Sequence, residues 1–316
     1  MSEEREKLAV LREFLGVSYR SGSERLFYCP KCEHHKKKLS VNIEKDVFKC
    51  WVCDYSGTSL RRLVRKYGNY KHQTMWSKFN PEIEVGRFEE IFLSLSQNTQ
   101  PLKEAQKTPL PSEFKTLAST QTSLAAKPAR RYLMDRGVTM KDILKWKVGY
   151  CSTGEYSGRV VIPSFDEEGD VNYFVGRSYD GNWKKYMNPA ASRDLVFNHL
   201  YVDWQSDLSI VEGVFDAIVA GNAVPILGSS LRDDSDLIKN IVLNDTPVYI
   251  ALDPDAEKKA MKIIKKLLTF GIELYKVNIL PYSDVGDMSK VEYQRRKEQA
   301  KLMTQDSFLE QAISSI

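Results

Sequence analysis

The chain contains 316 residues, of which 42% are hydrophobic and 28% are charged, as in folded globular proteins. A chain of this length usually forms about two domains. No stretch approaches the ~18 consecutive apolar residues of a membrane span, and the charged first residues do not resemble a signal peptide. We therefore expect a cytoplasmic protein that is neither secreted nor embedded in a membrane.

The net charge of +4 conceals a gradient along the chain. Residues 1–78 carry 17 basic and 9 acidic side chains, whereas residues 201–282 carry 8 basic and 12 acidic ones. A basic first part and an acidic later part suggest a module that binds a polyanion, joined to one that uses carboxylates. When charge alone is considered, the alternative is that the acidic and basic residues are distributed along the chain by chance.

The first 70 residues are expected to form a small domain of short strands. Apolar residues at helical spacing predict a helix over residues 1–20. Three short strands follow within residues 25–53, each ending near a turn or a cysteine pair. A basic helix is expected at residues 58–67, with Thr58 or Ser59 as its N-cap.

A domain boundary is expected next, because residues 96–126 contain four Ser, five Thr, three Pro and four Gln. Such a composition buries little apolar surface and is typical of a linker or tether. We assign the linker to residues 71–126.

The second half of the sequence predicts mixed helix and sheet. Residues 127–147 favour basic helices, and two strands are expected within residues 158–186. From residue 208 onward strands alternate with helices, which is typical of a parallel α/β sheet. After the linker, the predicted domains are a basic α+β subdomain at 127–207, an α/β subdomain at 208–287 and a helical tail at 288–316.

Two cysteine pairs, Cys29-x-x-Cys32 and Cys50-x-x-Cys53, are separated by seventeen residues. In a reducing compartment, paired cysteines favour metal binding over disulfides. Each pair makes a tight turn that directs two thiolates to one point, so the four sulfurs predict one structural Zn²⁺ ion per chain. Redox activity is the alternative, but the surroundings of the pairs do not resemble a thioredoxin-like fold.

Aromatic and basic residues alternate around the cysteine pairs. Aromatic rings stack on unpaired bases and lysines follow phosphates, so this composition suits single-stranded nucleic acid. A small ribbon also needs aromatic core residues, so we expect Phe27 and Phe48 in the core and leave Trp51 and Tyr55 open. The stretch His34–Lys38 is taken as a polar loop rather than as a source of spare zinc ligands. The candidate DNA-binding residues are Lys36, Lys37, Lys38, Trp51, Arg61 and Arg62.

Carboxylates follow two predicted buried strands. Glu212 comes directly after the strand residues 209–211, and Asp253 and Asp255 flank a proline after the strand residues 249–252. Ligands bind at the carboxyl ends of strands in open parallel sheets, so these side chains are expected to converge there. Hard oxygen ligands suit Mg²⁺ and hence phosphoryl chemistry. Taken singly, Glu212 is also compatible with a strand-to-turn junction and Asp255 with a helix cap.

In this order and spacing, the three carboxylates resemble the TOPRIM domain of primases and topoisomerases. The surrounding sequence is similar to the RNA-polymerase domain of bacterial DNA primases. The similar segments are Arg130–Gly137, Arg159–Pro163, Gly176–Arg177, Lys185–Asn188, Val211–Asp216 and Leu227–Ser230. A zinc ribbon, a linker and this domain follow one another as in these primases, and the resemblance covers most of residues 25–287.

The resemblance implies an α/β fold in which a small β zinc ribbon is joined to a basic α+β subdomain and a TOPRIM domain with a mainly parallel sheet. It implies the catalytic residues Glu212, Asp253, Asp255 and Lys185. It implies contacts to nucleotide or template by Arg159, Arg177, Lys185, Tyr186 and Asn188; for the basic residues among them, solvated surface charge is the alternative. Two or more Mg²⁺ or Mn²⁺ ions would be held by Glu212, Asp216, Asp253, Asp255 and Asp287. Asp287 matches the family pattern only loosely, and the sequence leaves open whether Asp284 or Asp287 joins the metal site. Such ions activate the ribose 3′-hydroxyl and neutralise the triphosphate.

Two departures from cellular primases refine this expectation. Cys32 stands where those proteins usually have a histidine, as in the all-cysteine ribbons of stand-alone tailed-phage primases. Few residues follow Asp287, and no Walker A motif is present, so a replicative helicase is expected as a separate chain.

The resemblance therefore implies a primase that makes short RNA primers for lagging-strand replication. Its partners would be a single-stranded DNA template, ribonucleoside triphosphates and the RNA/DNA hybrid. It would act in the cytoplasm, which is that of the bacterial host if a phage encodes the protein. A TOPRIM nuclease or recombination factor is one alternative. A non-catalytic zinc-ribbon adaptor that binds single-stranded DNA is the other.

Overall fold

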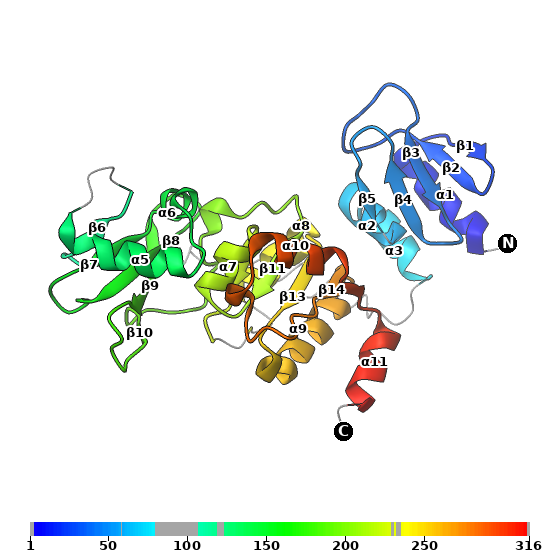
Figure 1. The fold of residues 1–316 in the computed structure, drawn as a ribbon. Coiled ribbons are helices and arrows are strands. Elements are labelled where there is room, and N and C mark those ends of the chain that lie inside the picture. The colour runs from blue at the N-terminus through cyan, green and yellow to red at the C-terminus, as the bar shows by residue number, and fades with distance from the viewer. Residues whose placement is uncertain are drawn as a thin grey trace. The chain divides into compact units, whose positions relative to one another are not determined.

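The computed structural model describes residues 3–57, 59–79, 107–118, 123–228, 231 and 235–314. The chain divides into two compact units, an N-terminal one of residues 1–98 with 269–273 and a C-terminal one of residues 99–268 with 274–316, and each is described by itself (Figure 1). No helix within the described ranges has both the length and the apolar character needed to span a membrane.

The N-terminal unit contains an antiparallel sheet in which every strand pairs with its neighbour in sequence. Its strands are β1 (Tyr19–Ser21), β2 (Glu24–Phe27), β3 (Leu39–Asn42), β4 (Val47–Cys50) and β5 (Ser56–Gly57). This arrangement confirms the short strands predicted between residues 25 and 53.

Among the described residues, this sheet is accompanied by the helices α1 (Glu3–Leu15), α2 (Leu60–Tyr67) and α3 (Tyr70–Ser77). The first helix is shorter than the predicted range 1–20, because Gly16 adopts a positive φ of 80° that ends it. Ser59 caps the second, its hydroxyl accepting a hydrogen bond of 3.3 Å from the backbone N–H of Arg61. The alternative cap, Thr58, lies outside the described residues.

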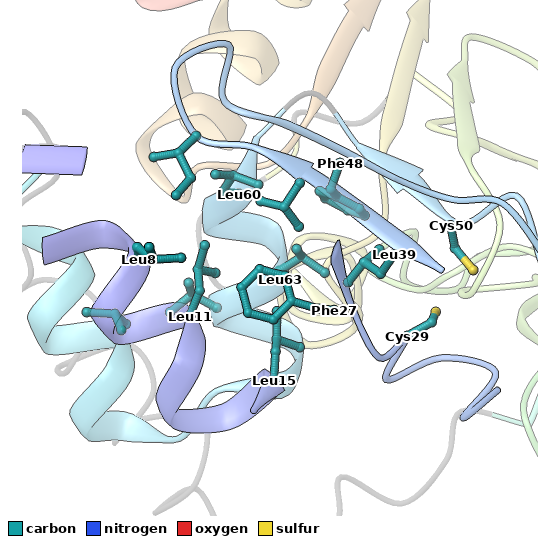
Figure 2. Close-up of a cluster of buried hydrophobic side chains, with 14 of the residues drawn as sticks. Leu8, Leu11, Leu15, Phe27, Cys29, Leu39, Phe48, Cys50, Leu60 and Leu63 are labelled. Carbon is teal, nitrogen blue, oxygen red and sulfur yellow. The ribbon is translucent and has the colours of Figure 1, made fainter. Parts of the chain in front are cut away.

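The core of the N-terminal unit lies between its helices and the sheet (Figure 2). Phe27 and Phe48 are both buried in it, as predicted. Fully buried leucines surround them, at Leu11, Leu39, Leu60 and Leu63. Burial of one such side chain stabilises a fold by about 1.5–3 kcal/mol, so this small cluster supplies most of the apolar driving force available to the unit.

The predicted linker at 71–126 is wrong at both ends. Residues at its start belong to α3, where Trp76 is buried in the N-terminal core. Near its other end Thr108 is buried, and its hydroxyl donates a hydrogen bond of 2.9 Å to the carbonyl of Asn172. Backbone and hydroxyl hydrogen bonds thus hold this polar stretch on a sheet, which composition alone did not reveal. Residues 80–106 and 119–122 of the predicted linker lie outside the described residues.

The C-terminal unit begins with an antiparallel sheet in the order β10-β9-β8-β7-β6. Its strands are β6 (Lys115–Thr116), β7 (Gly149–Cys151), β8 (Arg159–Phe165), β9 (Val171–Ser178) and β10 (Tyr186–Met187). The helices α5 (Lys127–Asp135) and α6 (Met140–Lys145) belong to the same subdomain. This confirms the predicted α+β character.

A second sheet, in the order β12-β11-β13-β14-β15, forms the rest of the unit. Its parallel strands are β11 (Leu208–Val211), β12 (Ala223–Pro225), β13 (Val248–Ala251) and β14 (Leu274–Lys276). Its helices are α7 (Val214–Ala220), α8 (Asp236–Asn244), α9 (Glu257–Thr269), α10 (Lys290–Glu298) and α11 (Gln305–Ser314). In Figure 1, β13 lies between β11 and β14, so the loops after β11 and β13 leave the sheet side by side.

The predicted helical tail at 288–316 is only partly helical. The strand β15 (Lys301–Leu302) pairs antiparallel with β14 and extends the sheet. Tyr293 of α10 is buried. The segment 288–302 is therefore an integral part of this subdomain.

Candidate active site and metal centres

The four cysteines of the two pairs converge on one point of the N-terminal unit, with all four sulfur atoms within 4.8 Å of one another. The sulfurs of Cys29 and Cys53 are 3.8 Å apart. Those of Cys32 and Cys50 are 3.9 Å apart. A tetrahedral site with Zn–S bonds of ~2.3 Å places its sulfurs ~3.8 Å apart. The cluster therefore has the geometry of the predicted structural zinc site.

The local backbone explains this convergence. The residue after each pair, Glu33 or Asp54, has a φ near +50°, which turns the chain back toward the cluster. The backbone N–H of Val52 also donates to the Cys50 sulfur at 3.5 Å. Burial raises the pKa of the Cys29 thiol to about 12, so zinc must displace a proton there when it binds.

The surface near the zinc cluster carries exposed aromatic rings beside lysines. Trp51 is 65% exposed, and the Lys49 ammonium lies 5.1 Å from its ring centre. The Lys37 ammonium lies 4.1 Å from the Tyr19 ring and 5.1 Å from the Tyr28 ring. Sequence reasoning missed Tyr19, since only the pairing of β1 with β2 brings it near. Rings and cations in this arrangement suit stacking on unpaired bases.

The remaining candidates of this unit have varied surroundings. Lys36 and Lys38 are exposed. Arg61 and Arg62 lie on α2, and the Arg62 guanidinium is 5.7 Å from the buried Tyr55 ring. The ring of Tyr55 thus belongs to the core, whereas Trp51 is exposed. Within the described residues the metal-ligand cluster contains cysteines alone, so the loop histidines are not part of it.

In the C-terminal unit, the predicted carboxylates lie at the carboxyl ends of β11 and β13. Glu212 directly follows β11, and Asp253 follows β13 after one further residue. Asp216 lies in the first turn of α7 and is 6% exposed. Its carboxylate accepts backbone hydrogen bonds from Gly213 at 2.7 Å and from Gly286 at 2.8 Å. Asp216 therefore joins the end of β11 to a loop more than sixty residues later.

The charges of these groups act on one another. Burial, followed by the charges of Asp216, Glu212, Asp284 and Asp255, raises the pKa of Asp253 to about 7. Burial is also the main cause that raises the pKa of Asp216 to about 6, with a further contribution from Asp284. Asp216 is buried, Glu212 and Asp253 are partly buried, and Asp255 is exposed. Mutual repulsion among such carboxylates marks a site that a cation would stabilise.

Asp284, rather than the predicted Asp287, faces this group. A Cβ atom placed on Gly286 would lie 3.0 Å from an Asp216 oxygen and 3.2 Å from an Asp284 oxygen. The Asp287 carboxylate instead accepts a hydrogen bond of 2.5 Å from the Ser283 hydroxyl. The charge of Asp284 is among the main causes that raise the pKa of both Asp253 and Asp216. The spacing of the two aspartates in sequence could not decide between them.

The donor set fits a hard divalent cation. One oxygen of Glu212 and one of Asp253 are buried and have no hydrogen-bond partner among the described residues. The other Glu212 oxygen accepts a hydrogen bond of 3.0 Å from Lys259. The carboxylates are more widely spaced than the thiols, because among the described residues only the cysteines bring three or more ligand atoms within 4.8 Å. Oxygen ligands of this kind suit Mg²⁺ or Mn²⁺.

The predicted basic residues lie on the neighbouring strands of the antiparallel sheet. Tyr186 of β10 pairs with Arg177 of β9, whose guanidinium lies 4.6 Å from the Tyr186 ring. Tyr186 is 45% exposed, and the partial burial of its ring, together with the nearby charge of Asp216, raises its pKa. Lys185 is exposed. The arginine, the tyrosine and the carboxylates therefore lie close to one another.

Two other predicted residues have different surroundings. Arg159 is only 4% exposed, and it donates to the carbonyls of Ser157 at 3.0 Å and Lys184 at 3.1 Å. These bonds favour a structural role for Arg159, namely holding the segment that carries Lys185. The side-chain oxygen of Asn188 is buried without a hydrogen-bond partner among the described residues.

Sequence reasoning assigned no role to Arg136, although the structure places it beside this site. Its guanidinium lies 4.9 Å from the ring of Phe215, the neighbour of Asp216, and 5.4 Å from the ring of Tyr132. Tyr132 in turn accepts a hydrogen bond of 3.0 Å from Arg177. The only signal in the sequence was the run Arg130–Gly137. Of the run Leu227–Ser230, the two serines lie outside the described residues.

Comparison with known proteins agrees with this architecture. No protein-family model matches the chain. The chain is 24% identical to the DNA primase of Aquifex aeolicus, over 85% of this chain and 61% of that protein. It is 21% identical to the DNA primase of Lactococcus lactis, over 96% of this chain and 58% of that protein. The chain thus spans about three fifths of the length of these curated relatives.

The fold also matches a solved structure. The catalytic domain of the DnaG primase bound to single-stranded DNA matches with a TM-score of 0.52 at 20% identity. The match covers 61% of this chain and 77% of that one. The chain is therefore similar to bacterial-type DNA primases, which confirms the family resemblance found in the sequence. The finer likeness to tailed-phage primases stays a prediction.

Proposed function

We propose that this protein is a DNA primase, an RNA polymerase that synthesises short RNA primers on a single-stranded DNA template. The observation that carries the proposal is the carboxylate group at the ends of β11 and β13 beside the Arg177–Tyr186 pair. A site of this kind offers carboxylates for cations and basic groups for phosphates. The similarity to primases across both units supports the same function.

Glu212, Asp216, Asp253, Asp255 and Asp284 would hold two or more Mg²⁺ or Mn²⁺ ions. When bound, such ions would lower the pKa of the ribose 3′-hydroxyl and offset the charge that develops on the triphosphate. The pKa of Asp253, raised to about 7, means that this group carries a proton part of the time at neutral pH. Cation binding favours the ionised carboxylate, so Asp253 would release that proton when the site fills.

Arg177 and Lys185 would bind nucleotide or template phosphates, and Tyr186 would offer a ring face to a base or sugar. Arg177 is preorganised for this task, because Tyr132 and the Tyr186 ring fix its guanidinium. A side chain held in place before the substrate binds loses less conformational entropy on binding. Asn188 would use its unpartnered oxygen for the same ligand.

The zinc-bearing unit would bind the template strand. Its exposed Trp51 and the lysines at 36–38 suit stacking on bases and contact with phosphates. The remaining partners are proposals from the resemblance: a replicative helicase as a separate chain, and the RNA/DNA hybrid as product. A cytoplasmic site of action, in the bacterial host if a phage encodes the chain, belongs to the same proposal.

Primer synthesis from labelled ribonucleotides on mixed-sequence single-stranded DNA tests the proposal. We expect short, template-dependent RNA with Mg²⁺, its loss in Asp253→Asn, and normal DNA binding by that variant. Asp284→Asn is expected to lose synthesis, whereas Asp287→Asn, its matched control, retains most of it.

Synthesis by Asp253→Asn at the wild-type rate would contradict the proposed metal site. DNA cleavage by the wild-type protein with Mg²⁺ and no nucleotides would instead support the nuclease alternative. DNA binding without synthesis or cleavage, and unaffected by Mg²⁺ or the carboxylate variants, would support the adaptor alternative.

A further inference from the structure

A lysine forms an ion pair with one of the proposed metal ligands. The ammonium of Lys259 lies 3.0 Å from one carboxylate oxygen of Glu212, and both side chains are 25% exposed. The second Glu212 oxygen is buried and has no partner among the described residues. Lys259 therefore places a positive charge in direct contact with this carboxylate.

The position of this lysine in its helix is unusual on electrostatic grounds. Lys259 lies in the first turn of α9, the helix that follows Asp255. The helix dipole disfavours cations at this end and favours them at the other. Contact with Glu212 offsets that repulsion, which accounts for the inward direction of the side chain. By contrast Lys262, one turn further along, is exposed.

We infer that Lys259 is the built-in counter-cation of the carboxylate group, and that it must leave Glu212 when divalent ions bind. The inference rests on the proposed function, because it concerns the same metal site. A carboxylate oxygen that accepts a hydrogen bond from an ammonium group must lose that hydrogen bond before it can bind a metal ion. Lys259 thus raises the ion concentration at which the site fills, and it keeps Glu212 neutralised until then.

The test is Mn²⁺ binding to the full-length, zinc-loaded protein without nucleotide, measured by electron paramagnetic resonance of free Mn²⁺. Lys259→Met retains the aliphatic stem but removes the charge, and we expect its Mn²⁺ dissociation constant to fall about tenfold, since like charges a few ångströms apart repel strongly at a partly buried site. Lys259→Arg, which retains the charge, and Lys262→Met, the matched control, are expected to stay within about twofold of wild type.

The outcomes separate this inference from the proposed function. Asp253→Asn should weaken Mn²⁺ binding if the carboxylates hold the ions. If it does, but Lys259→Met binds Mn²⁺ as wild type or more weakly, the counter-cation role is wrong and the metal site stands. If Asp253→Asn binds Mn²⁺ as wild type does, the proposed metal site fails and the role of Lys259 fails with it.

Discussion

The hydroxyl of Tyr293 donates a hydrogen bond of 2.8 Å to the hydroxyl of Ser209, 84 residues earlier in the chain. Ser209 lies in β11, three residues before Glu212, and both hydroxyls are buried. The bond therefore ties α10, from the segment predicted as a helical tail, to the strand that positions the carboxylate site.

Removing this bond should destabilise the C-terminal unit. Tyr293→Phe leaves the Ser209 hydroxyl buried without a partner, which should lower the free energy of unfolding by about 1–2 kcal/mol. Tyr293→Ala also creates a cavity, and we expect a loss of about 3–5 kcal/mol. Urea denaturation measures both. Val291→Ala, an exposed position on the same helix, should change stability by less than about 0.5 kcal/mol. Equal effects at positions 291 and 293 would show that α10 does not dock on the sheet.

Arg296 should be required to hold the loop that leads to Asp284. It donates hydrogen bonds to the carbonyls of Asn278 at 2.7 Å and Leu280 at 2.6 Å. Arg296→Met should cost about 1–3 kcal/mol, because it leaves two carbonyls without a charged donor. It should also speed hydrogen–deuterium exchange at residues 278–284.

The matched control for this change is Arg295→Met. Arg295 donates only to Glu292 on the same exposed helix surface, so its removal should change stability by less than about 0.5 kcal/mol. If hydrogen–deuterium exchange at residues 278–284 is unchanged in Arg296→Met, then Arg296 does not hold this loop.

The pair Asp142–Lys290 predicts a pH-dependent contribution to stability. Burial alone would raise the pKa of Asp142, but hydrogen bonds from Lys290 and Thr139 outweigh it and lower this pKa. A lowered folded-state pKa stabilises the fold above the unfolded value of about 3.9, and the contribution is lost as the pH falls through the folded-state pKa. Lys290→Met should therefore be less stable than wild type by about 0.5–1 kcal/mol at pH 7, with the difference vanishing in strong acid.

Urea denaturation at pH 7, 5 and 3 measures this difference. Lys141→Met removes an exposed positive charge next to Asp142 in sequence and serves as the control. A Lys290→Met defect that persists undiminished at pH 3 would mean that lost packing, rather than the ion pair, causes it.

Trp51 should contribute to DNA binding without contributing to stability. Because the ring is exposed, Trp51→Ala should unfold at the wild-type denaturant concentration and yet weaken binding of single-stranded DNA by about 1–3 kcal/mol, the value of one stacked base. Phe48→Ala removes a buried ring and should instead cost about 3–5 kcal/mol of stability. Fluorescence anisotropy with a labelled oligonucleotide measures the affinity. Wild-type affinity in Trp51→Ala would show that this ring is not part of the surface that binds the template strand.

The amino-acid sequence by itself determined the features that depend on residues close together in the chain. Two tight turns within 25 residues bring the cysteines together, so their spacing was sufficient to predict the cluster. Strands and helices followed from local periodicity. The ends of β11 and β13 placed Glu212 and Asp253 together, because parallel neighbouring strands end at the same edge of the sheet.

Only the tertiary structure decided the features that depend on contacts between distant segments. Asp284 rather than Asp287 faces Asp216 because of how one loop folds against α7. Arg159, predicted as a phosphate contact, is buried and donates to the carbonyls of Ser157 and Lys184, which lie in two different loops. The ion pair of Lys259 with Glu212 joins residues 47 positions apart. Such contacts arise from the packing of whole elements, and no local pattern of charge or hydrophobicity encodes which long-range partner a side chain meets.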